Sequence, residues 1–238
     1  MRTLKSLLAP TMLALSLYPA PGQSTFQNLD FESATLIPIP GDPYGSVQFV
    51  AAFPGWTGYI GTNQVSAALY NRAFLDSSGI AIIDSGWQHD LGAAAGVIEG
   101  SYSAILQAGV VGTITNPQDT RLSQTGLVPA GAQSLRFKAY DPTLLPSPLG
   151  VTLGGHALSL TQLSSGTNYI EFGADIRSWQ GQTAELDFIL FTTRPHTADR
   201  YLFLDSIEFS DLPIPEPSVL SLAALGAMLL GWPFLRKR

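Results

Sequence analysis

The chain has 238 residues, of which 45% are hydrophobic and only 13% are charged, so it holds enough apolar material for a folded core. Its formal net charge is −6, but residues 26–216 hold seven basic and eighteen acidic side chains and carry −11, which argues against a nucleic-acid partner. The chain has no cysteine, which excludes disulfides, thiolate zinc sites, iron–sulfur clusters and cysteine nucleophiles.

Residues 1–24 have the three parts of a secretory signal peptide. Arg2 and Lys5 form a basic start, residues 7–18 are almost entirely apolar, and residues 19–22 are prolines and small residues. We therefore predict export, with cleavage after Gly22 or Ser24. A buried N-terminal helix is the alternative, but the stretch lacks the polar face of an amphipathic helix.

Residues 25–212 have the regularly spaced turn residues of an all-β domain. Glycine and proline recur about every ten residues, and no long stretch shows the 3.6-residue period of a helix. Gly154 and Gly155 suit a two-residue hairpin turn between two short strands. We predict a β-sandwich of jelly-roll type with strands at 45–52, 80–84, 101–107, 135–139, 151–153, 156–160, 183–190 and 201–209.

The order of local features in this domain resembles that of galactose-binding-like jelly rolls, which include several carbohydrate-binding modules. The features, in order, are Asn28–Glu32, Pro54–Trp56, Gly100–Gln107, Ser123-Gln124, Pro129–Gly131, Leu135–Ala139, Trp179–Thr183 and Leu204–Ile207. The resemblance implies the fold and says little about a ligand, because one fold serves many functions.

Asp205 is a candidate ligand for a structural metal ion. Strict alternation along residues 201–209 places it on one face with four apolar residues, Tyr201, Phe203, Ile207 and Phe209. In the jelly rolls that this domain resembles, an acidic residue near the first strand and another in the last strand often help to bind calcium. The resemblance therefore implies a calcium site at Glu32 and Asp205, completed by backbone carbonyls. Alternatively, Asp205 accepts backbone hydrogen bonds at the mouth of a loop.

Several aromatic residues are candidates for stacking against sugar rings. Aromatic faces pack on the apolar faces of sugars, while amides and carboxylates bind the hydroxyls. The predicted ligand-binding residues are Trp56, Tyr59, Trp87, His89 and Asp90, with Tyr102 and Trp179 as further loop aromatics. The alternative for each tryptophan is a place in the core of the sandwich.

The sequence favours a protein that is not an enzyme. Its histidines, His89, His156 and His196, lie far apart and form no His-Glu-x-x-His zinc motif. Nucleophile-elbow, dinucleotide-binding and phosphate-binding motifs are absent from the sequence. A pair of glycosidase carboxylates among the eighteen acidic residues stays open as an alternative.

The C-terminal residues 213–238 predict a membrane segment. Residues 218–235 carry no charge and would form a helix about 27 Å long, close to the roughly 30 Å hydrocarbon layer. Arg236, Lys237 and Arg238 follow directly and should stay on the cytoplasmic side, which leaves residues 25–212 outside. A core helix is the alternative, but three consecutive cations directly after an apolar run are unusual there.

This tail, with Pro215-Glu216-Pro217, an apolar segment and a basic end in that order, resembles the PEP-CTERM sorting domain of Gram-negative bacteria. The resemblance implies recognition and cleavage by an exosortase, with an inner-membrane precursor and a mature protein at the cell surface or in the extracellular matrix. It makes Pro215, Glu216 and Pro217 a recognition motif. We therefore predict a non-catalytic structural or adhesive role; the alternatives are an exopolysaccharide-binding module and a secreted glycan hydrolase.

Overall fold

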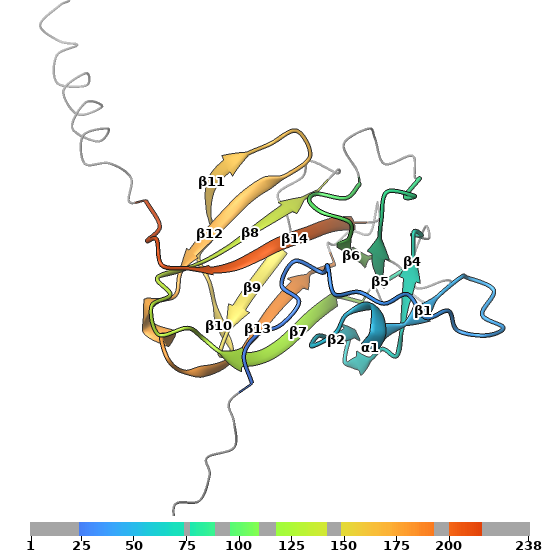
Figure 1. The fold of residues 1–238 in the computed structure, drawn as a ribbon, viewed down its shortest axis with the longest axis horizontal. Coiled ribbons are helices and arrows are strands. Elements are labelled where there is room, and N and C mark those ends of the chain that lie inside the picture. Colours follow the sequence, from blue (N-terminus) through green and yellow to red (C-terminus); the bar gives the residue numbers. More distant parts are fainter. Residues whose placement is uncertain are drawn as a thin grey trace, which may run out of the picture.

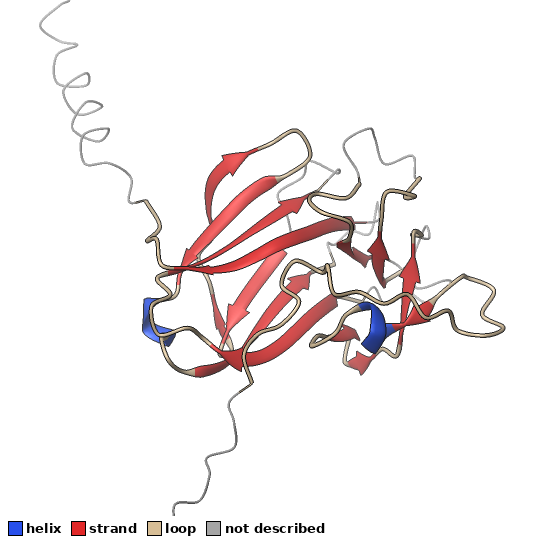
Figure 2. Ribbon diagram, in the orientation of Figure 1, coloured by secondary structure: helices blue, strands red, loops and turns tan. Residues whose placement is uncertain are grey.

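In the computed structural model, two β-sheets face each other (Figure 1). The structure describes residues 24–73, 77–88, 96–109, 118–141, 149–192 and 200–215. Almost all regular structure in these residues is strand, which confirms the all-β, two-sheet prediction (Figure 2).

The larger sheet has eight strands, and most of it lies above the smaller sheet in Figure 1. Among the strands that the structure describes in this sheet, β4 (Ala67–Tyr70) and β5 (Gly79–Ile83) pair in parallel, and the other neighbours pair antiparallel. The spatial order is β1 (Val47–Gln48), β4 (Ala67–Tyr70), β5 (Gly79–Ile83), β6 (Ser103–Ala108), β14 (Arg200–Ser210), β8 (Ser134–Tyr140), β12 (Ile170–Asp175) and β11 (Thr161–Ser165).

The smaller sheet has six antiparallel strands. Their order is β10 (His156–Ala157), β9 (Leu149–Leu153), β13 (Thr183–Leu190), β7 (Thr120–Leu127), β2 (Thr57–Ile60) and β3 (Asn63–Gln64). The hairpin predicted at Gly154-Gly155 is confirmed. Both glycines have positive φ, 59° and 77°, which residues with a Cβ adopt only with strain.

The predicted strand at 45–52 is wrong beyond Gln48, where the chain forms the helical turn α1 (Phe49–Ala52). Phe49 and Ala52 are three residues apart and both are buried, whereas Val50 between them is 73% exposed. The helical turn therefore buries two apolar groups on one side. A second short helix, η1 (Arg177–Trp179), precedes β13.

The main core fills the space between the sheets, and a second cluster covers the other face of the larger sheet. Ile82, Leu106 and Leu204 face the main core, while Ile83, Ile105 and Phe203, each next in sequence to one of them, belong to the second cluster. The central strands β5, β6 and β14 are thus buried on both faces. Trp87 packs edge-on against Phe203 in the second cluster.

Strand β14 contains a bulge that changes which side chains share a face. Ser206 has a positive φ of 49°, and the pairing of β14 with β8 shifts between Asp205 and Glu208. Beyond the bulge, Ile207 and Phe209 pack against the main core, whereas Tyr201 and Phe203 lie in the second cluster. The prediction that all four share one face with Asp205 is wrong, because an extra residue reverses the alternation.

The predicted terminal segments fall almost entirely outside the described residues. These are the signal peptide except Ser24, the membrane segment 218–235 and the basic residues 236–238. In the part of the chain that the structure describes, no helix is long and apolar enough to cross a membrane.

Candidate functional site

The first loop and the last strand bring several carboxylates together at one cavity. The cavity has a volume of about 320 Å³, and both Glu32 and Asp205 line it. We call its acidic lining residues, Asp30, Glu32, Glu99, Asp205 and Glu208, the acidic cluster. The structure thus places the two predicted calcium ligands at the same cavity, although 173 residues separate them in the sequence.

Asp205 is the buried member of the acidic cluster, with only 1% of its surface exposed. Its Oδ2 accepts hydrogen bonds from Ser103 Oγ at 2.5 Å and from the Glu99 backbone N–H at 3.2 Å, and its Oδ1 accepts one from the Ser206 N–H at 2.6 Å. Burial raises the pKa of the Asp205 carboxyl to about 7, despite these hydrogen bonds, and the negative charge of Glu32 adds to the increase.

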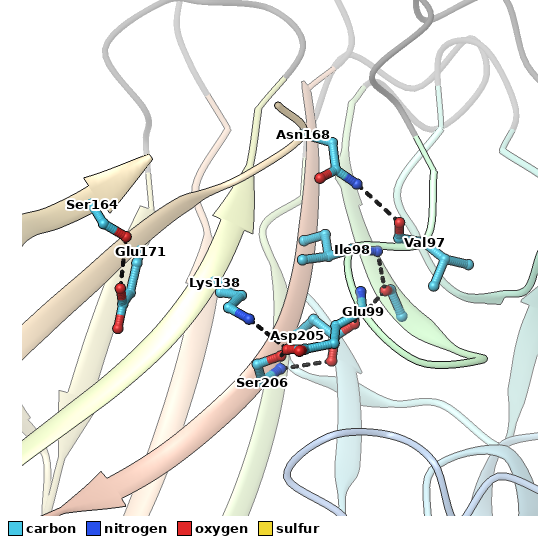
Figure 3. Close-up of polar contacts among 10 residues, drawn as sticks. Val97, Ile98, Glu99, Lys138, Ser164, Asn168, Glu171, Asp205 and Ser206 are labelled. Atoms are coloured by element: carbon cyan, nitrogen blue, oxygen red, sulfur yellow. Dashed lines mark hydrogen bonds and ion pairs between the residues drawn. The ribbon is translucent and has the colours of Figure 1, made fainter. Parts of the chain in front are cut away.

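Glu99 links the acidic cluster to β8. Its Oε2 accepts hydrogen bonds from Lys138 Nζ at 2.5 Å and from Ser206 Oγ at 2.6 Å (Figure 3). The Lys138 ammonium holds the pKa of Glu99 below its usual value, and Glu99 raises that of Lys138. Asn168 Nδ2 donates to the carbonyl of Val97 at 3.0 Å and so ties the loop before Glu99 to the β11–β12 hairpin.

Both oxygens of Asp205 and one oxygen each of Glu32 and Glu99 accept hydrogen bonds from donors of the protein itself. Glu32 Oε1 accepts the backbone N–H groups of Ser101 at 2.8 Å and Tyr102 at 2.9 Å. Calcium needs six to eight oxygens directed at one point. Among the residues that the structure describes, no group of three acidic or histidine side chains could hold a metal ion. The arrangement fits the hydrogen-bonded alternative for Asp205 better than a calcium site.

The two tryptophans predicted to bind sugar lie in the cores. Trp56 is 4% exposed, packs near Phe31 and Phe188, and donates its indole N–H to the carbonyl of Asn28 at 3.0 Å. Trp87 is 9% exposed and belongs to the second cluster. Both therefore follow the core alternative, because buried indole faces cannot stack on a sugar. His89 and Asp90 lie outside the described residues.

Tyr59 lies on β2 and is partly exposed. The Arg121 guanidinium lies 4.1 Å from the centre of its ring, and Arg121 Nη1 is 3.3 Å from Asp187 Oδ1. Asp187 Oδ2 accepts a further hydrogen bond from Thr152 Oγ1 at 2.9 Å. These polar groups bind one another across β7, β13 and β9, so Tyr59 belongs to a self-contained network on the outside of the smaller sheet.

A larger cleft, of about 640 Å³, opens where the β1-β4-β5 side of the larger sheet meets β2 and β3 of the smaller one. We call it the edge cleft. Its described lining is uncharged and combines an exposed tyrosine, serine hydroxyls and an amide with an apolar floor: Tyr44, Ser46, Ile60, Gln64, Val65, Ser66, Ala67, Leu69, Ser77, Ser78, Gly79 and Ile80. Tyr44 is 56% exposed, which leaves much of its ring open to solvent.

Local contacts fix the shape of the edge cleft. Asp42 Oδ2 accepts the backbone N–H groups of Tyr44 at 3.1 Å and Ser46 at 2.7 Å, and these bonds shape the loop that carries the tyrosine. Ser78 Oγ lies 3.0 Å from the carbonyl oxygen of Gly109 and 2.7 Å from that of Gln118. The two Ser78 contacts join the wall of the edge cleft to the end of β6 and to the residues just before β7.

Sequence reasoning missed the edge cleft because its residues come from four separate stretches. One local signal was available. Tyr44 stands between Pro43 and Gly45 in a loop rich in proline and glycine, where an aromatic residue has no strand to bury it.

Pro215 is the one residue of the Pro-Glu-Pro motif within the described part of the chain, and it is exposed. The residues just before it lie against the larger sheet. Gln133 Nε2 donates to the carbonyl of Asp211, and Ser134 Oγ donates to that of Leu212, both at 2.7 Å. The motif therefore begins directly at the surface of the folded domain.

No protein-family model matches the chain, and no curated protein matches its sequence. Among solved structures, it is similar to the carbohydrate-binding module TmCBM61 in complex with β-1,4-galactotriose, with a TM-score of 0.41, 12% identity, and coverage of 78% of this chain and 96% of that one. It is also similar to the K2 cleaved adhesin domain of Lys-gingipain, with a TM-score of 0.43, 18% identity, and coverage of 76% and 96%. Because both TM-scores are below 0.5, the function proposed below depends on this chain's own residues.

Proposed function

We propose that the protein is an exported, non-catalytic adhesive protein of the cell surface or extracellular matrix, and that its β-sandwich, of jelly-roll type, binds a neutral saccharide in the edge cleft. The observation that carries the binding proposal is the chemistry of the cleft. An exposed tyrosine ring lies beside hydroxyl and amide groups in a described lining without a charged side chain.

Sugars need this combination of groups. The apolar face of a pyranose ring packs on an aromatic ring, and its hydroxyls exchange hydrogen bonds with neutral polar groups. A uronate or sulfate group would find no cationic partner in the described lining, and the net charge of −11 over residues 26–216 would repel it. The proposed ligand is therefore a neutral stretch of exopolysaccharide.

Export and sorting are supported by the sequence of the two ends. The signal peptide would direct the chain across the inner membrane of a Gram-negative bacterium. An exosortase would then read Pro215, Glu216 and Pro217 and remove the membrane segment. Proline lacks a backbone N–H and resists helix formation, so the two prolines keep the motif extended beside the membrane.

The binding proposal is tested with the full-length protein in detergent. It is applied to a glycan array that carries both neutral and acidic polysaccharides, and retention is repeated by affinity electrophoresis. We expect retention on at least one neutral polysaccharide. Retention on acidic polysaccharides alone, or on none, would contradict the proposed ligand class. Release of reducing sugar from a bound glycan would instead support the hydrolase alternative.

The sorting proposal is tested separately, in the host cell. Replacing Pro215, Glu216 and Pro217 together by alanine should leave the tail uncut and hold the protein in the inner-membrane fraction. If this variant matched the wild type in size and location, the sorting proposal would be wrong.

A further inference from the structure

Residues 211–214, which we call the strap, cross the outside of the larger sheet between the end of β14 and the Pro-Glu-Pro motif. They form the orange-red end of the described chain in Figure 1. The strap is not a strand of either sheet. Three of its backbone carbonyls accept hydrogen bonds from side chains, one from Gln133 and two from β8.

Three consecutive residues of the strap are bound in turn. Gln133 and Ser134 bind the carbonyls of Asp211 and Leu212, and Arg136 Nη2 donates to the carbonyl of Pro213 at 3.3 Å. Arg136 Nε also donates to Ser134 Oγ at 3.2 Å, which steadies the guanidinium on this face. Side chains at alternate positions of one strand point to the same side, so Ser134 and Arg136 reach the strap together.

The last residue of the strap, Ile214, packs over a glycine of β12. A Cβ atom at Gly173 would lie 2.5 Å from Ile214 Cδ1 and 2.8 Å from Leu163 Cδ1. A side chain at this position would force Ile214 or Leu163 to move. Gly173 pairs with Arg136 in the register of β12 and β8, so the apolar contact and the arginine bond lie side by side.

The docked strap leaves almost no spacer before the sorting motif. Ile214 touches the sheet and Pro215 is the next residue, so the motif begins against the folded domain. A detached strap of four residues, fully extended, would add about 14 Å between the domain and the motif. For the proposed membrane-embedded enzyme, that spacing would keep the folded domain, which is wider than an extended chain, away from the enzyme and the bilayer.

The exposure of the strap favours local opening. Asp211, Leu212 and Pro213 are exposed, and Leu212 is 57% exposed. Few apolar contacts and solvent-exposed hydrogen bonds are the properties of segments that open locally while the rest of a domain stays folded.

We propose that the strap is a releasable spacer: it is detached from β8 and β12 when the Pro-Glu-Pro motif is cleaved, and it docks on them in the folded domain otherwise. Gln133, Ser134 and Arg136 are positioning residues for the docked state. This inference rests on the proposed sorting function of the motif.

The test locks or loosens the strap in the host cell and measures tail removal by pulse-chase. The chain has no native cysteine, so Gly173→Cys with Ile214→Cys can form only one intramolecular disulfide. The locked fraction, identified by its resistance to alkylation, should lose its tail at least tenfold more slowly than the wild type. Reduction with dithiothreitol should restore the rate, and each single cysteine variant should be processed at or above the wild-type rate.

Two milder variants test the opposite direction without depending on the disulfide. Arg136→Gln and Ile214→Ser should each speed tail removal, with an unchanged melting temperature of the domain as evidence that the fold is intact. Processing of the locked or the loosened variants at the wild-type rate would overturn the spacer proposal. The triple-alanine motif variant in the same experiment separates the two proposals. If that variant lost its tail at the wild-type rate, the sorting proposal itself would be wrong.

Discussion

Asp205 on β14 accepts a 2.5 Å hydrogen bond from Ser103 on the neighbouring strand β6, and this bond joins a carboxyl group with 1% exposure to the first residue of β6. Because burial raises the pKa of Asp205, we expect its protonation to make the stability of the fold depend on pH.

The first prediction concerns that pH dependence. Burial raises the pKa of Asp205 in the folded protein to about 7, from its ordinary value of 3.8, so the folded protein binds this proton more tightly than the unfolded chain. The contribution of Asp205 to stability is therefore greatest below pH 3.8 and is lost as the pH rises towards 7. Between pH 5 and 7 the free energy of unfolding should fall by up to about 1.4 kcal/mol per pH unit from this group.

Chemical denaturation across this range measures the effect. Asp84, Glu99 and Asp175 have lowered pKa values, so the stability that they contribute is lost only in more acidic solution. Asp205→Asn should abolish the slope between pH 5 and 7, while Asp175→Asn, a surface control, should keep it. An equal slope in wild type and Asp205→Asn would show that another group is responsible.

The second prediction concerns calcium. Donors of the protein occupy both oxygens of Asp205 and one oxygen each of Glu32 and Glu99, and no group of three acidic or histidine side chains among the described residues could hold a metal ion. We therefore expect that neither EDTA nor millimolar calcium will change the melting temperature. A site that bound calcium in the folded state alone would stabilise the protein by about 2.7 kcal/mol at one hundred times its Kd. An increase in melting temperature on adding calcium, abolished by Glu32→Gln, would instead support a calcium site at Glu32.

The third prediction tests the edge cleft. Tyr44→Ala should weaken binding of the retained neutral glycan roughly tenfold, equivalent to about 1.4 kcal/mol, because it removes the exposed ring. Tyr44→Phe should keep most of the affinity. Phe191→Ala is the matched control, since it removes another exposed aromatic ring, 42% exposed, that does not line the cleft. Equal affinities for all three variants, by calorimetry, would place the binding site elsewhere.

The fourth prediction concerns packing beneath the edge cleft. A Cβ atom at Gly58 would lie 2.5 Å from Phe49 Cε2 and 2.8 Å from Ile80 Cδ1, and Ile80 lines the cleft. Gly58→Ala should therefore destabilise the protein by about 1–3 kcal/mol in urea denaturation. Gly131→Ala meets no atom within 4 Å and should cost little or nothing. Similar losses in both variants would point to a backbone effect and away from overpacking.

Much of the strand pattern could be predicted because it is local. Strand β13 coincides with the predicted 183–190, since polar and apolar residues alternate from Thr183 to Phe188 and Leu190 continues the apolar face. The hairpin at Gly154-Gly155 was predictable for a similar reason, because two adjacent glycines favour one type of turn.

Other strands were missed because their stability comes from distant partners. Strand β7 carries the polar sequence Ser123-Gln124-Thr125, and Gln124 is buried because it exchanges hydrogen bonds with the backbone of Gln27, 97 residues away. The edge strand β3 has only two residues, too few to show any periodicity.

The sequence alone determined that this is an all-β protein, because a period of two and frequent turn residues act within a few positions. Only the tertiary structure decided which faces are covered: it buried Trp56 and Trp87, reversed the alternation at Ser206 and assembled the edge cleft from distant segments. Alternation fixes the two sides of a strand, but the pairing of strands far apart in the sequence decides which side meets a core, a cavity or water.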